Sequence, residues 1–131
     1  MTMLLETMQP DPDWDARGCE SAIETLRSRA GDLTIHIWGG DWCGDCQDTL
    51  PGVAASFVAA GIDPATTRQY PVEKADDGTK HGPKVDEYDI EYIPTIVIER
   101  DGTEVARFVE SAPEPPIVVL AEQLESVKST I

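Results

Sequence analysis

The strongest constraint on the fold is a cysteine pair that stands between an apolar strand and a helix. Residues 33–38 predict a short strand, residues 39–40 a glycine turn, and residues 43–60 a helix. Cys43 and Cys46 open that helix. Two cysteines separated by two residues can close a small disulfide ring and reopen it with little rearrangement. The sequence therefore predicts a redox-active pair at a strand–helix junction.

The order of the two thiols along the helix predicts different roles for them. Cys43 stands at the helix start, where unpaired backbone N–H groups and the helix dipole stabilise negative charge. This environment favours the thiolate, which is the form that attacks a disulfide. Cys46 lies one turn further in and is predicted to be the resolving thiol. The carboxylate of Asp45, next to Gly44, opposes the thiolate and is expected to tune the pair.

Length and composition are those of a single domain. The chain has 131 residues, of which 40% are hydrophobic, so we expect one domain over 1–131 with residues 1–12 as an N-terminal extension. No stretch is long and apolar enough to span a bilayer, and the first ten residues lack the basic cluster of a secretory signal. Three cysteines are too few for a disulfide-stapled secreted scaffold. These features predict a cytoplasmic protein, and a monomer is expected.

The charge balance excludes several classes of partner. Twenty-five acidic residues against ten basic ones give a net charge of -15. Nucleic acids and anionic membranes both require clustered Lys and Arg, so neither is expected to bind. A solvated acidic surface of this kind is typical of halophilic proteins, in which salt screens the self-repulsion. An ordinary acidic cytosolic protein is the alternative.

The remaining periodicities predict an α/β fold. In chain order they indicate a helix over 14–29, a strand over 68–73, a loop over 76–82, a short helix over 83–88, paired strands over 95–99 and 104–109, and a closing helix that includes 117–127. Pro51 is expected to interrupt and kink the helix over 43–60. This order of elements predicts a central mixed sheet with helices on both faces.

Four motifs together resemble the thioredoxin family: Trp42-Cys43-Gly44-Asp45-Cys46, Pro51, Ile93-Pro94-Thr95 and Asp101-Gly102. The resemblance covers roughly residues 33–128, with the helix over 14–29 as the leading helix. It implies a thioredoxin-like fold and an enzyme that reduces protein disulfides. It also implies disulfide-containing protein clients, an electron-donating reductase, and no cofactor other than the Cys43–Cys46 disulfide itself.

The resemblance assigns roles to individual residues. Cys43 would attack the client disulfide, and Cys46 would resolve the mixed disulfide. Pro94 would be in the cis form and would bring the Ile93 backbone close to the client chain, which pairs with it as a short strand. Trp42 would cover the sulfurs and shape the docking surface.

This chain departs from the family pattern near the cysteines. Thioredoxins usually hold a buried acid six positions before the first cysteine, where this chain has Ile37. The proton of Cys46 would then leave to water or to another group. Gln47 replaces a common Lys, and Glu110 replaces a Gly that commonly contacts partners.

Other interpretations of the cysteines stay open at this stage. The pair could be structural, or half of a zinc site, but the remaining ligand candidates Cys19, His36 and His81 are scattered, so no metal is expected. Cys19 and His36 are interpreted as core residues. The chain could also be a thioredoxin-fold adaptor, or a redox- or metal-sensing binding module, that holds a client without turnover.

Overall fold

The described part of the chain is built on a mixed sheet. A computed structural model describes residues 6–15, 17–62, 66–74, 80–82, 84–109 and 116–126. The sheet has four strands, which are β1 (Leu33–Gly39), β2 (Thr67–Pro71), β5 (Thr95–Arg100) and β6 (Thr103–Val109). They lie in the order β2-β1-β5-β6, with β1 parallel to β2 and antiparallel pairing elsewhere. The predicted central mixed sheet and its β5–β6 hairpin are confirmed.

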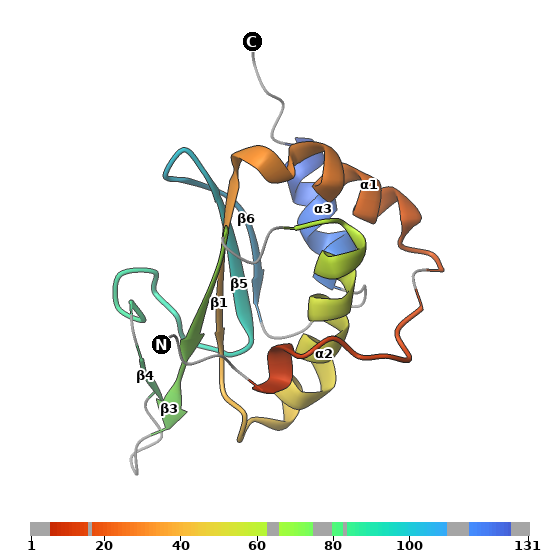
Figure 1. Ribbon diagram of the computed structural model, residues 1–131. Helices are drawn as coiled ribbons and strands as arrows, with labels where there is room; N and C mark the ends of the chain where they lie inside the picture. The colour runs from red at the N-terminus through yellow and green to blue at the C-terminus, as the bar shows by residue number, and fades with distance from the viewer. Residues whose placement is uncertain are drawn as a thin grey trace.

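The α-helices of the described residues lie together on one side of this sheet (Figure 1). They are α1 (Glu20–Arg29), α2 (Gly44–Ala59) and α3 (Pro116–Ser126). The β1–α2–β2 segment is a parallel crossover, so α2 runs back across the sheet between two neighbouring strands. Its N-terminal end therefore meets the end of β1, where the cysteines are.

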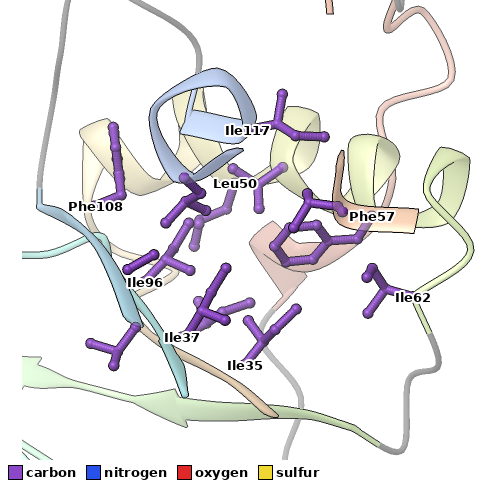
Figure 2. Close-up of a cluster of buried hydrophobic side chains, with 14 of the residues drawn as sticks. Ile35, Ile37, Leu50, Phe57, Ile62, Ile96, Phe108 and Ile117 are labelled. Atoms are coloured by element: carbon purple, nitrogen blue, oxygen red, sulfur yellow. The ribbon is translucent and has the colours of Figure 1, made fainter. Parts of the chain in front are cut away.

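The core between the sheet and the helices fixes the position of β1. Side chains alternate along a strand, and Ile35 and Ile37 both point to the helical side, where they are fully buried. Figure 2 shows them gathered with Leu50 and Phe57 of α2. Full burial of such a side chain stabilises the fold by about 1.5–3 kcal/mol. The last residue of β1, Gly39, is thus held in a fixed place.

The opposite face of the sheet is covered by turns where a helix was predicted. Residues 84–89 form consecutive turns instead of the helix expected over 83–88. Lys84 and Asp89 have φ angles of 61° and 54°, in the left-handed region, and so cannot continue a right-handed helix. Aromatic rings of His36 and Trp38 fill this face in place of a helix. The expectation of helices on both faces is corrected accordingly.

The first helix begins at Glu20 instead of at residue 14. The carboxylates of Asp11 and Asp15 each accept the backbone N–H two residues further on. These local bonds compete with helix formation. Gly18 then adopts a φ of +86°, which turns the chain before α1 starts.

Three further features of the chain differ from expectation. The helix α2 is continuous through Pro51, so the predicted interruption is wrong. The strand over 68–73 is divided at Val72, into β2 and the short strand β3 (Glu73–Lys74). The strand β3 pairs with β4 (Lys80–His81), inside the segment predicted as a loop.

The described residues also contain two short 3-10 helices, η1 (Glu6–Met8) and η2 (Ala30–Asp32). No helix among the described ranges is long and apolar enough to cross a membrane. Glu110 and residue 127 of the predicted closing helix lie outside the described residues.

Candidate functional site

The cysteine pair lies where β1 ends and α2 begins. Cys43 is the N-cap of α2, with extended backbone angles of φ -89° and ψ 123°. Its sulfur accepts the backbone N–H of Cys46 at 3.4 Å. The thiol thus takes the place of a capping oxygen and satisfies one of the N–H groups that a helix start leaves unpaired. Cys43 is half-buried and so open to a partner, and both thiols are free in this structure.

Cys46 has a very different environment one turn further in. Its side chain is fully buried, and its sulfur accepts the backbone N–H of Gly40 at 3.5 Å. Burial raises the pKa of Cys46 to about 12, and the charge of Asp45 adds to this shift. Ile37, at the position where the resemblance expects an acid, is also buried and offers no proton acceptor. Cys46 is therefore a thiol, not a thiolate, at neutral pH.

The loop before β5 faces the first cysteine. The Ile93–Pro94 peptide bond is cis, as predicted. The Sγ atom of Cys43 lies 4.0 Å from the carbonyl oxygen of Ile93, at the limit of a hydrogen bond that the thiol donates to this oxygen. The Thr95 hydroxyl donates to the carbonyl of Tyr92 at 2.5 Å, which closes the loop around the proline. Residues some 50 positions apart in the chain are thus brought together at the thiol.

Trp42, which precedes Cys43 in the chain, is held against the backbone of Val72 and Gly40. Its indole N–H donates to the carbonyl oxygen of Val72 at 2.8 Å, and 48% of its side chain remains exposed. A Cβ atom on Gly40 would lie 2.5 Å from the indole nitrogen. Only glycine therefore lets the ring lie across the backbone at this point. Val72 also donates its own N–H to Gly39, so one buried residue fixes both β1 and the indole.

The polar residues around the pair are placed by backbone contacts. Asp45 is exposed in the first turn of α2. Gly44 is exposed as well, with open space where a side chain would be, so no steric contact requires glycine there. The amide of Gln47 donates to the carbonyl of Asp41 at 2.7 Å. Gln47 thus supports the loop before Cys43.

Three residues of this site were not singled out from the sequence. Gly40 was expected only to turn the chain, and Val72 and Tyr92 carry no motif of their own. Their roles depend on the hydrogen bonds to Cys46, Trp42 and Thr95, which only the folded chain reveals. The one signal in the sequence was the place of Tyr92 directly before Ile93-Pro94.

The remaining candidate ligands are core or surface residues. The ring nitrogens of His36 lie 2.8 Å from the Tyr70 hydroxyl and 2.6 Å from the Glu99 carboxylate. His36 is therefore a satisfied core histidine, as predicted. Cys19, which directly precedes α1, is buried in the core, whereas His81 is exposed. No group of three or more metal-binding side chains gathers among the residues that the structure describes.

Comparisons with known proteins identify the fold. No protein-family model and no curated protein sequence matches this chain. Among solved structures it is similar to mitochondrial thioredoxin 3 of Saccharomyces cerevisiae in its oxidised form, with a TM-score of 0.52 and 16% identity over 82% of this chain and 90% of that one. It is also similar to thioredoxin of Fasciola hepatica, with a TM-score of 0.52 and 22% identity over 85% of this chain and 92% of that one. The resemblance that the motifs predicted is thus confirmed at the level of structure: this chain has the thioredoxin fold.

Proposed function

We propose that this chain is a thioredoxin-like oxidoreductase that reduces protein disulfides through Cys43 and Cys46. The observation that carries the proposal is the asymmetry of the pair. Cys43 caps a helix and is accessible, whereas Cys46 is buried beneath it and protonated. The carbonyl oxygen of Ile93, 4.0 Å from the Cys43 sulfur, supports the same function, because it places a backbone group of a second segment next to the attacking sulfur. No cofactor beyond the pair itself is needed.

The proposed reaction has two exchange steps. In the first, the Cys43 thiolate attacks one sulfur of the client disulfide. The Cys43–client S–S bond forms as the client's own S–S bond breaks, and the sulfur that leaves takes a proton from solvent. In the second, Cys46 gives up its proton and attacks the Cys43 sulfur, which releases the other client thiolate to be protonated. The client gains two electrons and two protons, and the chain is left with a Cys43–Cys46 disulfide.

The second step depends on removing the Cys46 proton. Ile37 cannot accept it, so water that reaches the pair during the mixed-disulfide stage is the proposed acceptor. The N–H of Gly40 is already aimed at the Cys46 sulfur and would stabilise the thiolate as it forms. A dithiol donor or a reductase in the cytoplasm would then return two electrons to the Cys43–Cys46 disulfide.

Trapping experiments test the two assigned roles. Cys46→Ser removes the resolving thiol, so this variant is expected to accumulate a mixed disulfide with a disulfide-containing client such as insulin. Cys43→Ser is expected to trap little, because the remaining thiol is buried. The adducts are resolved by non-reducing electrophoresis and mass spectrometry, with Cys19→Ser present in both variants to exclude the third thiol. Equal trapping by the two variants would contradict the assignment.

A non-turnover adaptor is a second candidate, and two observations favour it. The high pKa of Cys46 and the absence of an acid at Ile37 both slow release of a captured client. Catalytic reduction of insulin with dithiothreitol as donor separates the two functions. A reductase turns over many insulin molecules per chain, whereas an adaptor stops after one mixed disulfide.

A further inference from the structure

We propose that the surface around Cys43 selects clients whose disulfide is flanked by Lys or Arg. This inference rests on the proposed function, since it concerns the client that the same pair reduces. The recognition would combine two exposed aromatic side chains with an acidic rim, which we define as Asp45, Asp48 and Glu91.

The aromatic part of the surface lies on the two segments that meet at Cys43. Trp42 directly precedes Cys43 and is 48% exposed, held in place by its bond to Val72. Tyr92 directly precedes Ile93, whose carbonyl lies 4.0 Å from the Cys43 sulfur, and is 51% exposed. Large exposed aromatic side chains beside a reactive group are typical of a docking surface, because they bury much apolar area at little entropic cost.

The charged residues on the same two segments, 41–48 and 89–94, are all acidic. The stretch 41–48 contains three aspartates and no Lys or Arg, and Glu91 adjoins Tyr92 without a basic residue in 89–94. Asp45, Asp48 and Glu91 are all exposed, and none of them forms an ion pair within the described part of the chain. The neighbouring strand β3 adds one acid and one base, Glu73 and Lys74, whose charges offset each other.

This arrangement acts on a client over a short range. At physiological ionic strength charges interact over about 8 Å, so the rim affects mainly groups that flank the docked disulfide. Cationic side chains of the client that flank the disulfide would be attracted to the carboxylates of the rim. They would also be attracted to the faces of the aromatic rings. Acidic groups at the same places would be repelled, and such complementarity changes association rates by roughly 10- to 1000-fold.

Two matched peptides test the proposal. Each contains one intramolecular disulfide and the same apolar residues, with Lys at the flanking positions of one peptide and Glu at those of the other. The fully reduced chain is mixed with each peptide, and the second-order rate constant of disulfide reduction is measured. The Lys peptide is expected to react at least about tenfold faster than the Glu peptide in 0.15 M KCl, and the ratio is expected to fall towards one in 1 M KCl.

Variants separate the rim from the overall acidity of the chain. The variant Asp45→Asn, Asp48→Asn, Glu91→Gln removes the rim and is expected to lower the Lys-to-Glu ratio several-fold. The control Asp101→Asn, Glu122→Gln, Glu125→Gln removes the same formal charge. Asp101 lies at the β5–β6 turn, at the opposite end of the sheet from Cys43, and Glu122 and Glu125 are exposed on α3. The control is expected to keep most of the ratio.

The measured quantity is the ratio of the two rate constants, Lys peptide to Glu peptide. Asp45 also affects the pKa of Cys46, but this effect and any loss of folded protein act on both peptides alike and cancel in the ratio. Equal rates for the two peptides in 0.15 M KCl would overturn the proposed selectivity and leave the proposed function intact. A preference that the rim variant retains in full would overturn it as well. Failure to reduce either peptide would count against the proposed function itself.

Discussion

The two thiols differ in burial, and burial controls the step that releases a client. Cys46 is fully covered, and its pKa is raised to about 12 chiefly by desolvation. Below that value, each unit of pH changes the thiolate fraction about tenfold. Release by Cys46 is therefore expected to be slow at neutral pH and to accelerate steadily in alkali.

This dependence can be measured with a chromogenic aromatic disulfide, which reacts first with Cys43 and is then released by Cys46. In a Cys19→Ser background, the rate of the second release is expected to rise about tenfold per pH unit between pH 6 and 9. Asp45→Asn removes a charge that raises the Cys46 pKa, so its profile should move to lower pH. A plateau within this range would mean that Cys46 titrates well below 12.

Gly40 matters to the site because it has no side chain. An added Cβ atom would lie 2.5 Å from the Trp42 indole nitrogen, so the ring must move and lose its bond to Val72. Because Trp42 is half-exposed, it can move without opening the core. Gly40→Ala is therefore expected to lower kcat/KM for insulin reduction several-fold with little change in Tm. In a Trp42→Phe background the same substitution should have a much smaller effect, and equal effects in both backgrounds would disprove the coupling.

At the scale of elements, the N-terminal segment is more closely tied to the site than an extension is expected to be. The backbone N–H of Thr7 donates to the carboxylate of Asp41 at 3.0 Å. The N–H of Asp11 donates to the carbonyl of Pro51 in the middle of α2 at 3.1 Å. The segment around η1 therefore connects the loop before Cys43 with the helix that follows it.

Removing the Asp41 carboxylate should loosen this connection. Asp41→Ala leaves the Thr7 N–H without its acceptor and is expected to cost about 1 kcal/mol in the free energy of unfolding. Asp41→Asn keeps an acceptor oxygen and should cost less. Urea unfolding at constant salt measures both values. Identical stabilities for the wild type and Asp41→Ala would show that the contact contributes nothing.

Elements that carry a local signal could be predicted from the sequence. The strand before Cys43, the helix that it caps and the turn at Asp101-Gly102 all follow from periodicity and turn chemistry. The division of the strand at Val72 and the turns over 84–89 could not be predicted. Both depend on tertiary contacts or on left-handed backbone angles that ordinary residues adopt only in a folded context.

At the scale of the whole molecule, the face on which each element packs was the least predictable property. The sequence pattern around His36 resembles that of any half-buried strand. Its ring is nevertheless buried with Tyr70 and Glu99 on the sheet face where a helix was expected. Such a polar and aromatic cluster is assembled from three strands and leaves no periodic trace in any one of them. The candidate site was predictable because its motifs are local, whereas its supporting residues Gly40 and Val72 were not.

The net charge of -15 has a consequence for stability that local contacts do not remove. The Arg27–Glu24, Lys84–Glu87 and Arg107–Glu104 pairs each join residues three positions apart. The first two pairs are exposed and contribute little, and none of the three brings distant acidic segments together. Repulsion among the remaining carboxylates therefore opposes folding in dilute buffer and decreases as the Debye length falls to about 3 Å near 1 M salt.

We therefore predict that the fold is stabilised by salt, as expected of a halophilic protein. The Tm is expected to rise by roughly 5 °C or more between 0.1 M and 2 M KCl, which corresponds to about 1 kcal/mol for a domain of this size. Circular dichroism melts in KCl and in a weakly salting-out chloride salt separate screening from a general effect of salt on apolar surface. The Asp101→Asn, Glu122→Gln, Glu125→Gln variant has less charge to screen and should gain less. A Tm that rises in neither salt would count against a halophilic origin, because it would show that screening of the acidic surface does not stabilise the fold.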